Sequence, residues 1–297
     1  MIKSLEVINN KNESTTIILC DPTRSGFLIT NIDGLDAPKS TINMIERTRF
    51  DGGVYNGSRS NSRNIVISLE YFQDNTNKDS IEDLRHKAYR IFPVGEQITL
   101  IFTANNRKVQ FSGYVESNEV NPFTSHEGSQ VSIICSNAYG QGLTESTDYF
   151  SGVNPLFEFP FSNESLTEPL IEFGELYNVY SKMIDVQSEV KTGFVLNVEF
   201  KESINGLIVN NLTNGQSMKI SGSFVDGDVL VVNTILGQKS CTLNGNNNLG
   251  NFFTNAGNDW VNLLPRDNYI TIRDGLGNDT LSASMVNIEY PFLYMGV

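Results

Sequence analysis

The stretch QITLIFTANNRKVQFSGYVE, residues 97–116, decides the fold class of this 297-residue chain. After the turn Asn105-Asn106, apolar residues alternate with polar ones, which is the period of a strand with one buried face. The stretch therefore predicts a β-hairpin. Shorter runs with the same alternation recur at residues 65–69, 131–135 and 194–200. The sequence thus predicts a mainly β protein.

One segment has the period of an α-helix instead. Four apolar residues between positions 80 and 92 share one helix face: Ile81, Leu84, Ala88 and Ile91. Ser80 can accept a hydrogen bond from the first turn, and Asp83 follows three residues later, as at a capped helix N-terminus. Pro93 cannot continue a helix, so we expect the helix to end just before it.

The second half of the chain has a different pattern, which begins after about residue 150. A proline-rich and aromatic stretch, residues 153–161, leads into short strands without any helical pattern. Turn dipeptides that tolerate positive φ separate these strands: Asn214-Gly215, Asp226-Gly227, Asn244-Gly245 and Asp274-Gly275. We therefore expect two domains, residues 1–150 and 151–297, of which the second is a two-sheet β-sandwich of jelly-roll type.

The formal net charge of the chain is −13, from 34 acidic and 21 basic side chains. Such a charge opposes non-specific binding to polyanions, so proteins that read nucleic acids or coat anionic membranes are disfavoured. The first residues lack the apolar core of a signal peptide. No run approaches the roughly 18 apolar residues of a membrane span, so we expect no membrane insertion.

The cysteines and histidines do not form a recognisable catalytic or metal site. Three widely separated cysteines lack C-x-x-C spacing, so we expect them to be small buried side chains: Cys20, Cys135 and Cys241. His86 lies on the predicted helix away from its apolar face, and His126 lies in a loop. Neither has a partner at ligand spacing, so we expect no catalytic residue, no metal site and no cofactor.

Two acidic pairs are candidates for hydrolytic carboxylates, because paired carboxylates can cleave glycosidic bonds. These are Asp226 with Asp228 and Asp274 with Asp279. Each pair flanks a glycine-containing turn. The second pair loosely resembles the Gly/Asp calcium repeats of β-helices, but such sites need stacked repeats and the pattern occurs once. We interpret both as hairpin turns, and we do not expect an enzyme.

Arginines cluster in the first half around the glycine-rich residues 51–57. They are Arg47, Arg49, Arg59 and Arg63. One interpretation is a solvated loop with Glu46 and Asp51 as counter-ions. The other is an inter-subunit interface, in which the planar guanidinium groups pair with carboxylates of a neighbouring subunit. Contact with DNA is a third interpretation, and it is the least favoured.

Several motifs, taken in order, resemble the phage distal tail protein (Dit) family. In the first half these are ITNIDGLD (29–36), DGGVY (51–55), RNIVISL (63–69), FSGYVE (111–116) and QVSIIC (130–135). In the second half these are IVNNLTNGQ (208–216), GDVL (227–230) and YPFLYMGV (290–297). One departure is Pro265-Arg266-Asp267-Asn268, where the family pattern has glycine before Asp-Asn. The resemblance covers nearly the whole chain.

The resemblance implies a split β-barrel with one helix for residues 1–150 and a galectin-like sandwich for residues 151–297. It further implies that the first domain assembles into a homohexameric ring at the tail tip of the virion, after synthesis in the host cytoplasm. The tail tube protein would bind one face of this ring and the tail-associated hub protein the other. Receptor-binding proteins would attach to the second domain, and DNA would pass through the ring without specific binding.

Two other functions remain open from the residues alone. The first is a carbohydrate-binding module for the host surface, in which Trp260 stacks on a sugar. Its neighbours Val261, Leu263 and Leu264 favour packing in the core instead. The second is a tail-tip hydrolase, which would release sugar or peptidoglycan fragments.

Overall fold

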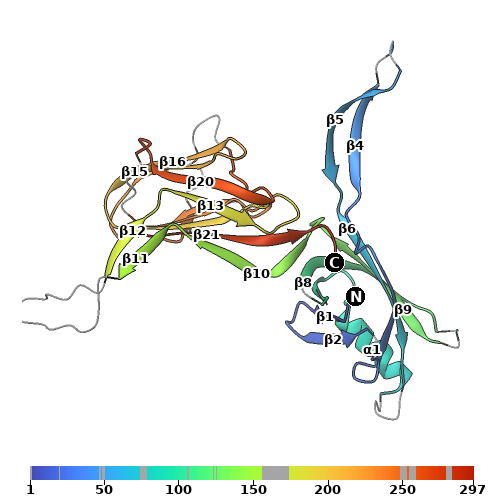
Figure 1. Ribbon diagram of the computed structural model, residues 1–297. Helices are drawn as coiled ribbons and strands as arrows, with labels where there is room; N and C mark the ends of the chain where they lie inside the picture. The colour runs from blue at the N-terminus through green and yellow to red at the C-terminus, as the bar shows by residue number, and fades with distance from the viewer. Residues whose placement is uncertain are drawn as a thin grey trace, which may run out of the picture. The chain divides into compact units, whose positions relative to one another are not determined.

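A computed structural model describes residues 2–19, 21–46, 48, 51–73, 79–105, 107–122, 124, 126–155, 174–247, 253, 259–278 and 283–297. The chain divides into two compact units, Met1–Leu143 with Leu293–Val297, and Thr144–Phe292 (Figure 1). The boundary predicted from the sequence lies at residue 150, with the last residues of the chain in the second domain. The observed division falls within one strand, β10 (Gly140–Tyr149), so no linker composition marks it.

The first unit is built on one antiparallel sheet with the strand order β3-β6-β9-β8-β7-β1-β2. Strand β8 pairs with β7 along its first half and with β9 along its second half, so the sheet bends around a single core. The strands are β1 (Ser4–Ile8), β2 (Ser14–Ile18), β3 (Phe27–Asp33), β6 (Arg63–Tyr71), β7 (Gln97–Thr103), β8 (Lys108–Val120) and β9 (Gly128–Cys135).

The hairpin predicted from residues 97–116 is confirmed as β7–β8. Leu100 stands opposite Phe111 in the register, and both side chains are buried. Gly113 interrupts the apolar alternation on β8 because a Cβ there would lie 2.8 Å from the sulfur of Cys135, on the neighbouring strand β9. The alternation in the sequence therefore reflects a sheet face that is packed on the core.

The predicted helix is confirmed as α1 (Ile81–Ile91). Its N-terminus has the expected capping box, since the Ser80 hydroxyl accepts from the Asp83 amide and the Asp83 carboxylate accepts from the Ser80 amide. Its C-terminus is held from β8, where the Asn118 side-chain amide donates to the carbonyls of Ala88 and Phe92, at 3.4 Å each. Among the described residues, no helix has the length and apolar character needed to cross a bilayer.

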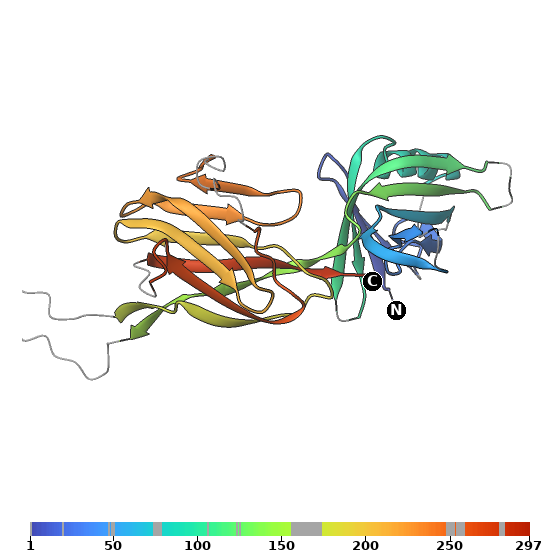
Figure 2. The same cartoon turned by 90° about the horizontal axis from the view of Figure 1, so that it is seen from above.

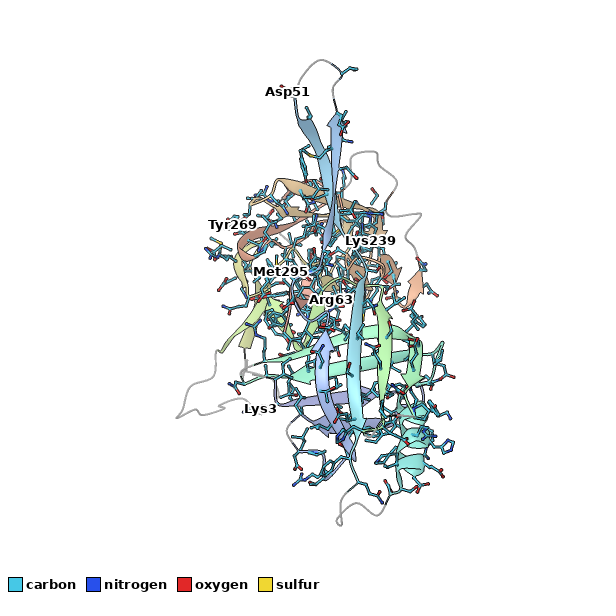
Figure 3. All side chains as sticks on the ribbon, turned by 90° about the vertical axis from the view of Figure 1, so that its right-hand side faces the viewer. Lys3, Asp51, Arg63, Lys239, Tyr269 and Met295 are labelled. Atoms are coloured by element: carbon cyan, nitrogen blue, oxygen red, sulfur yellow. The ribbon has the colours of Figure 1, made fainter. Side chains whose placement is uncertain are left out.

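A two-stranded ribbon, β4 (Ser40–Glu46) and β5 (Gly53–Ser60), extends away from the rest of the first unit (Figure 1). Asp51, in the connection between the two strands, lies at its far end (Figure 3). One of the interpretations from the sequence placed residues 51–57 in a solvated loop, whereas residues 53–60 form strand β5. The signal was present, because Asp51-Gly52 is a hairpin dipeptide and Gly52 adopts φ +85°.

The second unit is a sandwich of two antiparallel sheets, seen as layers in Figure 1 and from above in Figure 2. One sheet has the order β13-β20-β15-β16, with β13 (Ser181–Val186), β20 (Arg266–Asp274), β15 (Ile204–Asn211) and β16 (Gln216–Phe224). The other has the order β19-β18-β17-β14-β21, continued by β10, with β19 (Asn246–Asn247), β18 (Ser240–Leu243), β17 (Val229–Asn233), β14 (Val195–Phe200) and β21 (Ala283–Tyr294). A separate pair is formed by β11 (Ser151–Pro155) and β12 (Gly174–Asn178).

The core of the second unit lies between its two sheets. The alternating residues of β14 and the residue before it face inward and are at most 1% exposed: Phe194, Leu196, Val198 and Phe200. They meet inward side chains of β15 and β16: Leu207, Val209, Met218 and Ile220. The mainly β fold expected from the sequence is confirmed in both units.

The departure from the family pattern at residue 266 has a conformational consequence. Arg266 adopts φ +72°, in the left-handed region that favours glycine, which is the residue that the resemblance leads us to expect there. Buried Asn268 fixes the turn, because its side-chain amide donates to the carbonyls of Leu264 and Arg266 while its oxygen accepts from the Leu264 amide. The turn is thus retained without glycine, at the cost of local strain.

Candidate assembly interface

Large apolar side chains are exposed on both faces of the β4–β5 ribbon. Met44 pairs with Tyr55 across the ribbon, so these two side chains share one face. Ile42 pairs with Ser58 beyond a shift in the register. Ile45 pairs with Val54 on the other face. Between 43% and 62% of the surface of each of these five apolar residues is exposed.

An isolated two-stranded ribbon is marginally stable in water, and contiguous exposed apolar side chains on a soluble protein commonly mark an interaction surface. In this chain the described part of the ribbon makes no sheet pairing beyond that between β4 and β5. Burial of the apolar side chains on its two faces therefore requires a surface outside the ribbon. We call this pair of faces, formed by Ile42, Met44, Ile45, Val54 and Tyr55, the ribbon surface.

The arginines that the sequence analysis grouped lie in different environments. Arg59 is exposed on β5, opposite Thr41 on β4, so it borders the ribbon surface. Arg47 and Arg49 fall outside the described residues. The prediction that these three arginines contact a neighbouring subunit stays a prediction.

Arg63 is different, because it is only 5% exposed and its donors are used within the first unit. Its Nε donates to the carbonyl of Ala138 at 3.0 Å, and its Nη1 donates to those of Gly34 and Asp36 at 2.7 Å each. Its Nη2 donates to the Met295 carbonyl at 2.6 Å (Figure 3). Arg63 is therefore an internal anchor, and these contacts disfavour the predicted role at an inter-subunit interface, which stays a prediction.

Two further features of Arg63 follow from its burial. Desolvation lowers the pKa of the guanidinium group below its usual value, although the nearby Cys135 and Asp36 oppose the shift. The guanidinium carbon also lies 4.9 Å from the centre of the Phe111 ring, in a cation–π contact. An arginine with a carbonyl on each nitrogen can hold three backbone segments together, since no other side chain offers five donors in a fixed plane.

The described residues do not assemble a catalytic centre from the cysteines and histidines. His86 and His126 are both exposed. Cys135 and Cys241 are buried, as expected, and burial raises the pKa of each thiol to about 11. Cys20 lies outside the described residues. Within the described part of the chain, no group of three His, Cys, Asp or Glu side chains could hold a metal ion.

The acidic residues of the two turns accept hydrogen bonds from groups within or beside their own turns. The Asp228 carboxylate accepts hydrogen bonds from the Val225 amide and the Asn244 side chain, and these bonds lower its pKa. Burial would raise the pKa of Asp274, but hydrogen bonds from Asn278 and from the amides that follow Asp274 outweigh this effect and lower it. A general acid needs a raised pKa, so neither carboxylate is suited to that role. Asp279 is outside the described residues.

Trp260 packs against the core of the second unit. Its ring stacks on that of Phe253, with 4.6 Å between the ring centres, and the Lys239 Nζ lies 5.0 Å from the Trp260 ring. Both contacts occupy ring surface that a stacked sugar would need. A glycan site on Trp260 stays a prediction, and these contacts disfavour it.

Comparisons with known proteins agree with this architecture. Residues 187–291 match the family model described as the siphovirus-type tail component, C-terminal domain. The structure of SPP1 Dit (gp 19.1), described as a paradigm of the hub adsorption apparatus in Gram-positive infecting phages, is similar with a TM-score of 0.65. The sequence identity is 12%, over 98% of this chain and 99% of that chain, so this likeness is one of fold.

Two structures of the phage P2 baseplate in its activated conformation are also similar. The form with Ca has a TM-score of 0.46 and 11% identity over 100% of both chains. The form with Sr has a TM-score of 0.47 and 10% identity over 99% of both chains. No curated protein matches the sequence. A siphovirus-type tail component domain thus matches residues 187–291 of the second unit, and the chain has the fold of SPP1 Dit over nearly its full length.

Proposed function

We propose that this protein is a structural subunit of the tail tip, that six copies form a closed ring, and that it is not an enzyme. In this proposal the first unit forms the ring through the ribbon surface, with Arg59, Arg47 and Arg49 at its border. The tail tube protein binds one face of the ring and the tail-associated hub protein binds the other. The second unit presents the attachment site for receptor-binding proteins.

The observation that carries this proposal is the ribbon surface. Within a closed ring every subunit presents the same two patches to its neighbours, so a ribbon from one subunit can pack on the next. A stable interface needs on the order of 1,000 Å² or more of buried surface. Five large apolar side chains on an element that stands away from its own core can supply the centre of such an interface.

The charge of the chain fits a ring through which DNA passes. With a formal net charge of −13 per subunit, a ring of identical copies repels a polyanion. We expect DNA to move through such a ring without specific binding.

The experiment measures the mass of the purified full chain and its appearance by negative-stain microscopy. We expect rings with a mass of about 200 kDa, six times the 33.0 kDa of one chain. The double variant Ile42→Glu and Tyr55→Glu should be folded but monomeric, because it places charge on the ribbon surface. The double variant Leu236→Glu and Leu276→Glu is the matched control, since both leucines are exposed in the second unit.

The control should still form rings. A monomeric wild-type chain at micromolar concentration would contradict the ring, and intact rings in the ribbon variant would contradict the ribbon as its interface. Release of reducing sugar or peptidoglycan fragments by the purified protein would contradict a purely structural role.

A further inference from the structure

The four-stranded sheet of the second unit has one face on the core and one outer face that carries a regular array of side chains. The register places these side chains in rows across the strands. Met183 stands beside Tyr269 in one row. The next row holds Ser181, Thr271, Asn210 and Ser217, and the one after it holds Arg273, Ile208 and Lys219.

Tyr269 lies along this face instead of standing out from it. Its hydroxyl donates to the Ser181 hydroxyl at 3.2 Å, in the next row, while 39% of the residue remains exposed. Figure 3 marks Tyr269 among the side chains of the second unit. A tyrosine held at its hydroxyl end offers an apolar ring surface whose orientation is fixed.

Hydrogen-bonding groups continue from Tyr269 across the sheet. The Asn210 side-chain amide donates to the Thr271 hydroxyl at 3.2 Å. With Ser181 beside Thr271 in the register, the hydroxyl and amide groups form a strip over three neighbouring strands. Thr271 is only 3% exposed, so Ser181 and Asn210 are the members of this strip that a ligand can reach. Such a strip can exchange hydrogen bonds with a ligand that carries many hydroxyl groups.

A hollow of about 330 Å³ lies at the other end of the same sheet. Its lining is polar or glycine, with one charged side chain: Asn205, Gly206, Lys219, Ser221, Gly222, Ser223 and Gly275. Glycine is required at two of these positions, because Gly206 has φ +77° and a Cβ on Gly275 would collide with the Asn205 carbonyl oxygen. Glycine at these two positions therefore lets the backbone segments beside the hollow approach each other closely.

We propose that this outer face binds a neutral oligosaccharide. The Tyr269 ring packs on the apolar face of one sugar, Ser181 and Asn210 bond the neighbouring sugars, and the hollow holds a sugar further along the oligosaccharide. Gly275 directly follows β20 and is six residues after Tyr269, which corresponds to roughly 20 Å of extended chain. The face is therefore long enough for several linked sugars. The site is separate from Trp260 and does not depend on the proposed ring.

Other classes of ligand fit this face less well. Strands β20 and β15 are paired on both sides, so a peptide cannot add to the middle of this sheet as a further strand. The hollow has no apolar side chain in its lining, whereas peptide anchors need apolar pockets. A nucleic acid is disfavoured by the net charge of −13.

The test applies the full chain to an array of neutral oligosaccharides and then titrates the best ligand into each variant. Tyr269→Ala should weaken binding at least about tenfold, because it removes the ring surface. Tyr269→Phe keeps that surface and should bind within about threefold of the wild type. Ser221→Phe should also weaken binding, because it places a ring in the hollow. Tyr114→Ala removes an exposed tyrosine of the first unit, so this control should bind normally.

Absence of binding to every neutral oligosaccharide would overturn the proposal. So would wild-type affinity in Tyr269→Ala, or a loss of affinity in Trp260→Ala alone. All variants should keep the mass and thermal unfolding of the wild type. Because ring formation is measured in the same preparations, failure of the saccharide site can be told apart from failure of the ring.

Discussion

Two hairpins of the first unit are built alike, but their apolar side chains differ in burial. The β7–β8 hairpin and the β4–β5 ribbon both carry apolar side chains on antiparallel strands. In β7–β8 one face is sealed against the core, and Leu100 and Phe111 are at most 2% exposed. In the ribbon both faces are open. Apolar residues on a strand therefore indicate a surface that becomes buried, but they do not tell whether the chain itself buries it.

The largest test of this comparison removes one aliphatic side chain from each hairpin. Leu100→Ala should lower the free energy of unfolding of the first unit by about 3 kcal/mol, because it leaves a cavity in the core. Ile45→Ala should change the stability of the monomer by less than about 0.5 kcal/mol but weaken ring formation. Denaturant unfolding and mass measurement check both. Equal losses of monomer stability would show that the ribbon is packed within its own chain.

The second test uses the two arginines that the sequence places close together. Arg63→Ala leaves buried carbonyls without donors, so we expect a loss of about 2–4 kcal/mol in the first unit. Arg59→Ala changes an exposed residue and should cost less than about 0.5 kcal/mol. Thermal unfolding of both variants measures the difference. A small effect of Arg63→Ala would mean that water replaces the lost guanidinium group.

The smallest expected effect is on the stability of the second unit, and it comes from the strained turn at Arg266. Arg266→Gly relieves a left-handed backbone conformation but adds entropy to the unfolded chain, so we expect a net gain of about 0.5–1 kcal/mol. The transition of the second unit in a thermal scan should move upward. Arg266→Ala keeps the strain and serves as the control. If both variants shift the transition equally, the gain does not come from φ.

Much of the fold could be predicted from the sequence because its signals are local. The helix follows from four apolar residues and a capping pair, and the turn at Asn244-Gly245 follows from residues that tolerate positive φ. The role of Arg63 could not be predicted, since its partners include Gly34, Ala138 and Met295, which are distant in sequence. The ribbon was missed because its strands lack the buried face on which alternation depends.

The candidate sites show the same limit. Arg59 could be proposed from clustering alone, but clustering did not separate it from buried Arg63. The outer face of the four-stranded sheet requires the register of four strands that are spread from residue 181 to residue 274. No spacing along the chain indicates that Ser181, Thr271 and Asn210 share a row.

The return of Leu293–Val297 to the first unit makes the second unit an insertion in the first. The chain leaves along β10 and comes back along β21, which lie next to each other in one sheet. A domain can be exchanged more easily when its two connections to the rest of the chain lie next to each other, as β10 and β21 do. Residues 144–292 could be replaced by a short turn or exchanged for a foreign domain whose termini are neighbours. In either case we expect the hydrogen bond from Arg63 to the Met295 carbonyl to be kept.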